Sequence, residues 1–309
     1  DVTSALTGGG PQQVTVAVWD PTDAGTQARG KQIRKPETIW YSPVTGIWQT
    51  VWLEPVPERA IERVKIVPDA KNGKVQMTVH ASGSAKPDVK VRVLSRSLGS
   101  KKEKIAPLET AGKAGEPLVT KIPQPRLWTP DAPWLYQYEV QLEGGDKATG
   151  YFGLRDVARG RDASGNQRLL LNGKPLFHYG PLDQGWWPDG LYTAPSDEAL
   201  LYDLLATKEI GFNMVRKHVK VEPARWYAHC DRLGLLVWQD MPNGDAHIRP
   251  EEPDIERSAQ SRRQYETEWS AIIESLHNHP SIVMWVPFNE GWGQFDTKRI
   301  VAWTHQLDS

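Results

Sequence analysis

The sequence predicts a multidomain chain made of a β-sandwich remnant, an immunoglobulin-like β-sandwich and the first half of a (β/α)8 TIM barrel. Three observations support this fold class. Residues 1–56 hold a few strand-like runs between turns, residues 57–155 hold a longer series of alternating strands, and residues 156–309 alternate short apolar strands with helices. At about 100–200 residues per domain, 309 residues accommodate this arrangement.

The composition is that of an ordinary globular protein, and it excludes two kinds of partner. Apolar residues make up 39% and charged residues 24%, and the formal net charge is −1. Nucleic-acid-binding proteins normally carry a basic excess, so we expect no nucleic-acid partner. Because the sequence has no apolar run of the length that spans a bilayer, about 18 residues or more, we expect no membrane partner.

The first 56 residues contain three runs rich in β-branched and aromatic residues. These are Val14–Trp19, Thr38–Tyr41 and Ile47–Leu53, and turn-forming Gly and Pro residues separate them. Three strands are too few to close a sandwich. We therefore interpret residues 1–56 as the last strands of one.

Residues 57–155 show the period-two alternation of half-buried strands. It is clear in Arg63–Val67, Val75–Val79 and Val89–Val93, and a final strand follows at Leu135–Leu142. About a hundred residues with strands at this spacing predict an immunoglobulin-like sandwich.

Beyond residue 165 the pattern changes to parallel β/α units. The predicted elements are strand Leu176–Gly180, helix 197–209, strand Phe212–His218, helix 223–233, strand Leu235–Asp240, helix 257–277, strand Ile282–Glu290 and helix 296–307. Four such units make half of a (β/α)8 barrel. A half barrel leaves open strand edges, so we expect the sequence to be truncated at both ends.

The carboxyl ends of barrel strands carry the active site in this fold. Polar and titratable residues collect there: His178, Tyr179 and Asp183 after the first strand, Arg216 and His218 at the second, Gln239, Asp240 and Asn243 at the third, and Asn289 and Glu290 at the fourth. This set suits a polyhydroxylated ligand. Most of the 14 tryptophans belong in cores, but Trp186, Trp187 and Trp292 lie in loops, where an indole can pack against a sugar ring.

The strongest signal is the segment Ile282–Gly293, in which a buried strand runs directly into Asn289 and Glu290. Glycosidic cleavage needs a carboxylic acid that protonates the leaving oxygen and a second carboxylate across the anomeric carbon. We expect desolvation by neighbouring aromatic rings to help Glu290 keep its proton. These rings are Trp285, Phe288 and Trp292. The alternative is a helix-capping turn without chemistry.

This segment resembles the acid/base signature of glycoside hydrolase family 2, which includes β-galactosidases, β-glucuronidases and β-mannosidases. Other stretches resemble the same family in the same order: Thr45–Glu54 the closing strands of its N-terminal sandwich, Tyr151–Arg155 the junction into the barrel, Leu171–Leu176 the hairpin into the first barrel strand, and Gly211–Arg216 and Trp226–Val237 the next two units. The resemblance covers nearly the whole chain.

The resemblance implies three domains and one activity. Residues 1–56 would be the C-terminal part of a sugar-binding-like jelly-roll sandwich, residues 57–155 the immunoglobulin-like β-sandwich, and residues 156–309 the first half of the catalytic barrel. The activity would be that of a retaining exo-β-glycosidase, which uses two carboxylates in a double displacement and needs no cofactor or metal.

The resemblance also assigns roles. It makes Glu290 the acid/base, Asn289 the ligand of the substrate 2-hydroxyl, and Arg216 a support of the nucleophile, with Asp240 at a position that is often acidic. The family supplies its nucleophile from strand seven. We therefore expect that residue beyond Ser309 and expect the 309-residue chain to be inactive alone.

Two departures from the family pattern affect the sugar pocket. In the family, the arginine begins the pattern Arg-x-Ser-His. In this chain, His218 follows Arg216 one position earlier than that pattern has its histidine. His218 is either a substrate contact or a support of one. The run Gly180–Trp187 replaces the Asn-Arg-His-Glu type run of many β-galactosidases. Asp183 and Trp187 are the candidate contacts within it.

Several alternatives remain open at this point. A β-galactosidase is the simplest activity, a β-glucuronidase is the next, and a non-catalytic carbohydrate-binding homologue would differ by lacking the strand-seven glutamate. His247 near Asp245 is more often a solvated pair than a metal site. A homo-oligomer is compatible with the sequence, and since many sugar-degrading enzymes are exported, a periplasmic or secreted location is preferred.

Overall fold

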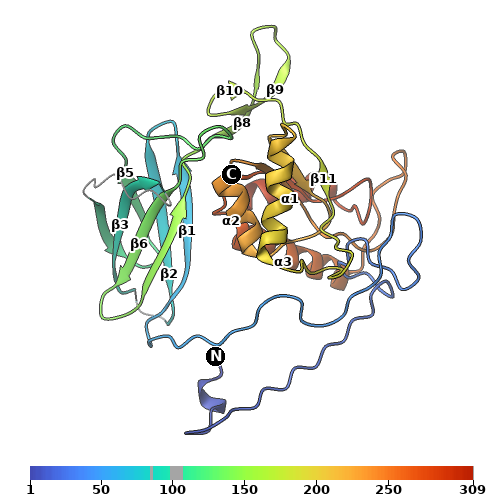
Figure 1. Cartoon of the computed structure of the whole chain (residues 1–309), viewed down its shortest axis with the longest axis horizontal. Helices are drawn as coiled ribbons and strands as arrows, with labels where there is room; N and C mark the ends of the chain where they lie inside the picture. Colours follow the sequence, from blue (N-terminus) through green and yellow to red (C-terminus); the bar gives the residue numbers. More distant parts are fainter. Residues whose placement is uncertain (84–85, 98–106, 309) are drawn as a thin grey trace.

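The computed structural model describes residues 1–83, 86–97 and 107–308. Figure 1 shows a β-sandwich and an α/β domain lying side by side, with the strands β8 to β10 beside their junction. The N-terminal residues form a long segment that runs outside both domains and reaches the α/β domain.

The β-sandwich consists of two antiparallel sheets with strand orders β1-β2-β5 and β4-β3-β6-β7. The strands are β1 (Ile61–Asp69), β2 (Lys74–Ala81), β3 (Asp88–Ser97), β4 (Leu108–Lys113), β5 (Pro117–Lys121), β6 (Tyr136–Leu142) and β7 (Lys147–Phe152). Each of the four runs predicted in this region lies within or overlaps one of these strands. The alternation of apolar side chains is therefore confirmed as a strand signal.

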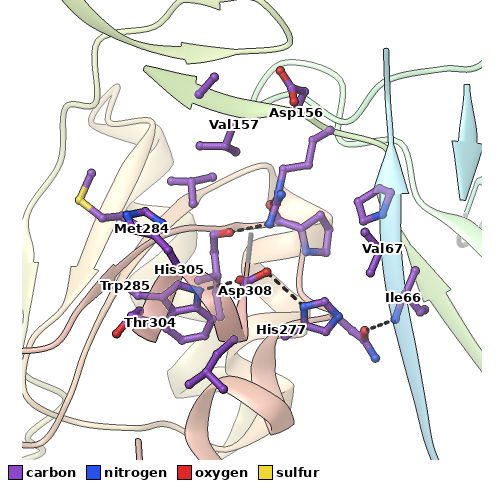
Figure 2. A pocket seen from close by; sticks show the side chains of 18 of the residues that line it. Ile66, Val67, Asp156, Val157, His277, Met284, Trp285, Thr304, His305 and Asp308 are labelled. Carbon is purple, nitrogen blue, oxygen red and sulfur yellow. Dashed lines mark hydrogen bonds and ion pairs between the residues drawn. The ribbon is translucent and has the colours of Figure 1, made fainter. Parts of the chain in front are cut away.

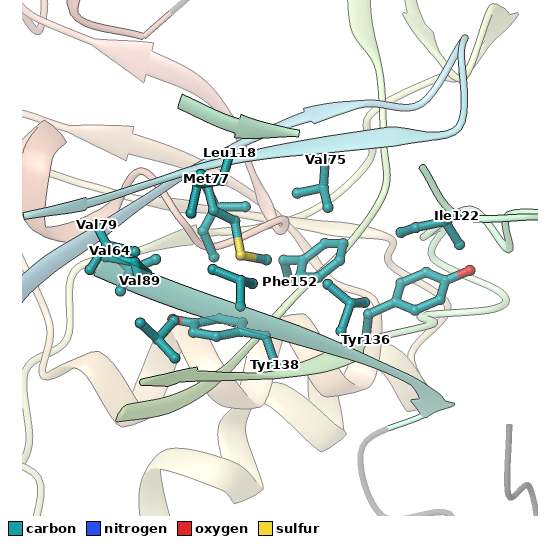
Figure 3. Packing of buried hydrophobic residues seen from close by; sticks show 14 of the residues in the cluster. Val64, Val75, Met77, Val79, Val89, Leu118, Ile122, Tyr136, Tyr138 and Phe152 are labelled. Atoms are coloured by element: carbon teal, nitrogen blue, oxygen red, sulfur yellow. The ribbon is translucent and has the colours of Figure 1, made fainter. Parts of the chain in front are cut away.

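The core of the sandwich is built from the inward-facing side chains of both sheets, as Figure 3 shows. In β2, Val75, Met77 and Val79 are fully buried, and the residues between them are half-buried. This alternation follows from the two-residue repeat of a strand. Phe152, at the end of β7, stacks on Tyr136 with ring centroids 5.4 Å apart and closes the core towards the barrel.

A small antiparallel sheet follows, made of β8 (Val157–Arg161), β9 (Gln167–Leu171) and β10 (Lys174–Pro175). The turn between β9 and β10 is Asn172-Gly173, with φ of 53° and 75°. Two successive residues at positive φ form the hairpin turn whose twist matches the strands, and Asn-Gly is its favoured sequence. The predicted hairpin at residues 171–176 is confirmed.

The α/β domain is a parallel sheet, in the order β11-β12-β13-β14, with helices between the strands. Its elements are β11 (Leu182–Asp183), α1 (Asp197–Glu209), β12 (Met214–Lys217), α2 (Ala224–Leu233), β13 (Leu236–Asp240), α3 (Ala259–Leu276), β14 (Ile282–Val286) and α4 (Thr297–Leu307). Ser196 and Ser258 cap α1 and α3 by accepting bonds from Ala199 N and Ser261 N. The predicted order of strands and helices is confirmed.

The first barrel strand is shorter than expected and lies later in the sequence. The predicted strand 176–180 is not one: Leu176 packs against a buried cluster, but Phe177 and Tyr179 are 79% and 56% exposed. The chain nevertheless runs beside β12, where Pro181 O accepts a bond from Arg216 N at 3.0 Å. Pro181 has no N–H, so regular pairing begins only at β11.

The three strands predicted within residues 1–56 are not formed. The described residues of this segment contain one short 3-10 helix, Thr3–Ala5, and an isolated bridge between Gln32 and Tyr41. Most apolar side chains of the predicted strands are exposed, with Trp19 at 87%, whereas Trp40, Tyr41 and Trp48 are half-buried. A strand needs paired neighbours to be stable, and the bridge at Tyr41 is the one pairing that these runs make in the described residues. The assignment of this segment to a sandwich stays a prediction.

One buried carboxylate joins the sandwich to the barrel. Asp231, on α2, is fully buried, and its Oδ2 accepts a hydrogen bond from the Tyr151 hydroxyl at 2.8 Å. Its Oδ1 accepts a bond from Ser281 N at 2.9 Å, and His279 Nδ1 lies 2.6 Å from Oδ2. The Asp231 carbonyl accepts a further bond from Trp128 Nε1 at 2.8 Å. Burial, and then the charge of Asp231, raise the pKa of Tyr151.

Tyr151→Phe is expected to lower the free energy of unfolding by about 2 kcal/mol, because a hydrogen bond to a buried carboxylate is lost while the ring remains. Urea denaturation followed by tryptophan fluorescence measures the effect. Tyr202→Phe is the matched control, since the Tyr202 side chain is 70% exposed. Equal midpoints for the two variants would contradict a joining role for Tyr151.

Candidate active site

The centre of the site is Asp240, at the carboxyl end of β13. Its carboxylate is fully buried and accepts two hydrogen bonds from Arg216, from Nε and from Nη2, both at 2.9 Å. This parallel arrangement fixes the plane of the guanidinium and is stronger than a bond between neutral groups. Asp240 therefore holds Arg216 in one orientation at the end of β12.

His218 shares the same carboxylate. Its Nδ1 lies 3.0 Å from Asp240 Oδ2, and the ring is 4% exposed. His218 follows the last residue of β12 and, two residues after Arg216, takes the same face, whereas Lys217 points to the other face and lies over the Trp226 ring of α2. The burial of His218 places it beneath the rim, as a support of Asp240.

Asn289 connects this pair to the end of β14. Its Oδ1 accepts a hydrogen bond from Arg216 Nη2 at 2.9 Å. Its backbone N–H donates to Asn243 Oδ1 at 3.1 Å, and Asn243 Nδ2 donates to Pro287 O at 3.0 Å. Its amide Nδ2 donates to Glu290 Oε2 at 3.5 Å, so Asn289 joins the arginine to the Glu290 carboxylate.

Glu290 lies in a turn with an uncommon backbone. Its φ is 50° and that of Gly291 is 76°. Trp292 N donates to Asn289 O at 2.8 Å, and Arg257 donates from Nε and Nη2 to Gly293 O at 3.0 and 2.7 Å. A non-glycine residue keeps a positive φ only when its surroundings hold the backbone in that conformation, and such residues cluster at functional sites.

The expected apolar surroundings of Glu290 are not found, and its side chain is exposed. The three aromatic rings pack elsewhere: Trp285 meets Trp269 edge-on at 5.8 Å, Phe288 stacks on Tyr265 at 5.4 Å, and Trp292 stacks on His247 at 5.0 Å. In each case α3 or the loop before it supplies a better apolar partner than the turn does. Trp292 is 1% exposed and supports the turn from below.

Two other candidates lie away from this cluster. Asp183 Oδ2 is 2.7 Å from Lys217 Nζ, on the helix side of the sheet, and its Oδ1 accepts a bond from Gly185 N at 2.8 Å. Trp187 packs against the apolar cluster between the sheet and the first two helices. The structure therefore brings Arg216, Asp240 and Asn289 together beside Glu290, and leaves Asp183 and Trp187 outside.

Behind the sheet lies a buried charge cluster that the sequence analysis did not identify. Glu222 Oε1 is 2.9 Å from Lys217 Nζ and 3.0 Å from Lys220 Nζ. Lys220 also donates to Gly185 O and Tyr192 O, at 2.6 and 2.7 Å. Burial alone would lower the pKa of Lys217, but its carboxylate partners outweigh burial and raise it. The cluster holds the loop of residues 185–192 in place.

Residues 22–48, here called the rim segment, lie against the carboxyl ends of the barrel strands, and Figure 1 shows this part of the chain beside the barrel. Tyr41 stacks on Trp186 with ring centroids 4.4 Å apart and an interplanar angle of 9°. Trp48 meets Tyr192 edge-on at 4.6 Å. The strand-like pattern of residues 1–56 predicts a separate domain, and it gives no signal that the rim segment lies at the site.

The negative charge of Glu290 acts on the pKa values of two basic side chains, Lys31 and His247. Burial lowers the pKa of Lys31, and the negative charge of Glu290 opposes that change. Burial and then the charge of Arg29 lower the pKa of His247, and Glu290 again acts in the opposite direction. Lys31 and Arg29 belong to the rim segment, and His247 pairs with Trp292 in a short antiparallel bridge.

A metal centre finds no support in the described ranges, which contain no group of three or more His, Cys, Asp or Glu side chains placed to hold an ion. Asp245 Oδ2 accepts a hydrogen bond from Ser261 Oγ at 3.1 Å, and His247 stacks on Trp292 instead of facing Asp245. None of the helices in the described parts is long and apolar enough to cross a membrane.

A separate cavity of about 650 Å³ lies between β1 of the sandwich, β14 and α4 (Figure 2). The Asp308 carboxylate at its wall accepts a bond from Trp285 Nε1 at 2.7 Å and lies 3.3 Å from His277 Nδ1. Burial raises the pKa of Asp308, but these two contacts outweigh burial and hold it below its usual value. Glu290, Asn289 and Arg216 do not line the cavity, so we locate the active site at the strand ends.

Two family models match the chain. "Glycosyl hydrolases family 2" matches residues 60–155, and "Glycosyl hydrolases family 2, TIM barrel domain" matches residues 165–309. Among curated proteins, the β-galactosidase of Photobacterium profundum is 27% identical over 288 residues, which are 88% of this chain and 27% of that protein. The chain thus spans about a quarter of that relative's length. A β-galactosidase of Lactococcus lactis is 26% identical over 185 residues, 60% of this chain and 18% of its own.

Solved structures show the same fold. A β-D-glucuronidase of Dictyoglomus thermophilum superposes with a TM-score of 0.66 at 21% identity, covering 82% of this chain and 43% of its own. A β-glucuronidase of Ruminococcus gnavus in complex with D-glucuronic acid gives 0.63 at 19% identity, with 81% and 40% covered. With an immunoglobulin-like sandwich followed by barrel units, and with both family models matched in order, this chain belongs to glycoside hydrolase family 2.

Proposed function

We propose that this chain carries the acid/base side of the active site of a retaining exo-β-glycosidase. The single observation that supports this most is the position of Glu290. It lies just beyond the carboxyl end of β14, in a turn held at positive φ, beside the hydrogen-bonded chain from Asp240 through Arg216 to Asn289. A carboxylic acid at a strand end next to oriented polar groups is what glycosidic cleavage requires.

In the proposed reaction, Glu290 donates its proton to the glycosidic oxygen as the bond to the anomeric carbon breaks. A second carboxylate attacks that carbon and forms a covalent glycosyl-enzyme. Glu290 then accepts a proton from water, which hydrolyses the intermediate and restores both groups. Among the described residues, the Glu290 carboxylate accepts a hydrogen bond from Asn289 Nδ2 at 3.5 Å. We assign the nucleophile to strand seven of a complete barrel.

The other residues of the cluster bind and orient. We assign Asn289 Nδ2 to the 2-hydroxyl of the sugar, since Oδ1 accepts a bond from Arg216 and Nδ2 lies beside the Glu290 carboxylate, 3.5 Å from Oε2. Arg216 brings a positive charge to the site where a second carboxylate would stand. Asp240 and His218 keep Arg216 in position, since both of its bonds to Asp240 are buried.

A β-galactoside is the first candidate substrate, because the curated relatives named above are β-galactosidases. A β-glucuronide is the second, and one observation favours it: Lys31 and His247 lie close enough to Glu290 for its charge to act on both. A non-catalytic sugar-binding homologue would keep Asn289 and Arg216 while lacking the second carboxylate.

The full product of the gene that encodes these residues is expected to hydrolyse aryl β-glycosides. The assay uses the 4-nitrophenyl β-galactoside, β-glucoside, β-mannoside and β-glucuronide, and NMR identifies the first-formed anomer of the released sugar. A retaining mechanism gives the β-anomer first. The 309-residue chain alone is expected to show no turnover. Initial release of the α-anomer would refute the proposed function. So would the absence of hydrolysis of all four glycosides by the full gene product.

A further inference from the structure

Arg257 is a buried arginine that directs most of its hydrogen bonds to one backbone carbonyl. It lies in the loop between β13 and α3 and is 6% exposed. Its Nε and Nη2 both donate to Gly293 O, at 3.0 and 2.7 Å. Its Nη1 donates to Ser261 Oγ at 3.3 Å, and the Asp245 carboxylate, its one ion-pair partner among the described residues, is 3.9 Å from Nε. The proposed reaction leaves this arginine without a role.

The carbonyl that Arg257 binds ends the turn that carries Glu290. Trp292 N donates to Asn289 O at 2.8 Å, and the two residues between them, Glu290 and Gly291, have φ of 50° and 76°. Positive φ at both central residues is the pattern of a type I′ turn, which favours glycine, asparagine and aspartate at these positions. Glu290 therefore needs contacts from outside the turn to keep this conformation.

The loop between β13 and α3 supplies such contacts. Its residues 245–248 run beside the turn, and Gly293 N donates to Ala246 O at 2.7 Å. The packing is close, since a Cβ on Gly293 would lie 2.3 Å from both Gly244 O and Arg257 Nη2. The turn and the loop therefore fit together only with glycine at residue 293, and the guanidinium lies directly against that glycine.

Two aromatic rings hold the guanidinium of Arg257 in place. Its Cζ lies 4.9 Å from the ring centroid of Tyr265 and 4.8 Å from that of Phe295. Both rings are buried, which leaves the guanidinium little freedom to turn away from the carbonyl. The Tyr265 hydroxyl also donates to Pro287 O at 2.7 Å. The backbone is thus held before Glu290 by a tyrosine and after it by an arginine.

We propose that Arg257 is a positioning residue for the acid/base, because it holds the turn in the conformation that directs the Glu290 carboxyl group at the glycosidic oxygen. The inference rests on the proposed function and adds to it a residue that acts through the backbone. A catalytic group must be held within about 0.5 Å of its productive position by residues that packing fixes. The two charge-assisted bonds to Gly293 O give the turn that support.

Arg257→Met removes the donors and keeps a side chain that can pack on the two rings. The full gene product is assayed on an alkyl β-glycoside and on the dinitrophenyl glycoside of the same sugar. A misplaced Glu290 impairs proton donation, which only the alkyl leaving group needs. We expect the ratio of alkyl to dinitrophenyl kcat/KM to fall by about tenfold or more, with KM for the alkyl glycoside little changed. Arg257→Lys keeps the charge and is expected to restore part of the ratio.

Arg155→Met is the matched control. Arg155 also donates two bonds to backbone carbonyls, to Pro280 O at 2.7 Å and to Ile282 O at 2.8 Å, but at the opposite end of β14. Thermal melts of both variants are expected to show a lower midpoint, whereas the ratio should change only in Arg257→Met. An equal loss of rate on both glycosides in Arg257→Met would refute the inference, because Arg257 would then serve the stability of the fold alone.

Two further outcomes are decisive. If Arg257→Met does not fold, Arg257→Lys carries the test, and a ratio equal to that of the unchanged enzyme refutes the inference. Glu290→Gln separates the inference from the proposed function. A ratio that Glu290→Gln lowers and Arg257→Met does not would refute only the inference, whereas a ratio unchanged by Glu290→Gln would refute the proposed function as well.

Discussion

Glu290→Gln is expected to lower kcat/KM of the full gene product by about 10²–10⁴-fold on glycosides with poor leaving groups, the usual contribution of a positioned proton donor. Glutamine keeps the size of the side chain in a turn whose backbone is held at positive φ, but it has no proton to give to the glycosidic oxygen. Alkyl glycosides, whose alkoxide leaving group needs that proton, are the substrates to measure.

Activated aryl glycosides separate this effect from a loss of binding. A dinitrophenolate leaves without protonation, so the first step should be much less impaired on that substrate. Glu256→Gln is the control, because Glu256 is an exposed carboxylate on the loop before α3. Wild-type rates for Glu290→Gln on both substrate kinds would show that Glu290 is not the acid/base.

Asp240→Ala is expected to lower the free energy of unfolding by about 3–5 kcal/mol, the usual effect of removing one partner of a buried ion pair. The Asp240 carboxylate is fully buried and accepts two bonds from Arg216, beside His218 and Val219 N. Its removal leaves a guanidinium without its counter-ion. Urea denaturation of the 309-residue chain measures the loss.

Glu109→Ala is the matched control for that measurement. Glu109 also pairs with an arginine, Arg92, but its side chain is 49% exposed, and exposed pairs contribute little to stability. Its denaturation midpoint should remain close to that of the unchanged chain. Similar midpoints for Asp240→Ala and Glu109→Ala would mean that water reaches Asp240 and that the strand ends are not a rigid support for Arg216.

Periodicity predicted the sandwich and barrel elements well, because the apolar side chains of each element face a core that is formed by neighbouring elements of the same domain. Val75, Met77 and Val79 alternate and are buried accordingly. The same pattern failed in residues 1–56, where apolar runs such as Val14–Trp19 are mostly exposed. Composition alone cannot distinguish a strand from an extended segment, since the difference is the presence of paired neighbours.

The sequence predicts those site residues whose positions follow from the direction of the strands alone. Arg216, Asp240 and Asn289 meet because parallel strands end at one edge. Asp183 does not join them, because its side chain pairs with Lys217 on the helix side of the sheet. Lys31 was missed because its position depends on contacts with Asn243, more than 200 residues further along the chain. No local pattern carries that information.

Residues of both domains bind the buried Asp231, and these contacts oppose any separation of the two domains that would admit a sugar. Hinge opening requires a domain boundary whose contacts separate readily. At this joint Trp128 and Tyr151 of the sandwich side and His279 of the barrel all meet one buried residue. The two domains should therefore move as one body. The Glu290 side chain is exposed without any separation of the domains, so slow domain opening should not limit turnover.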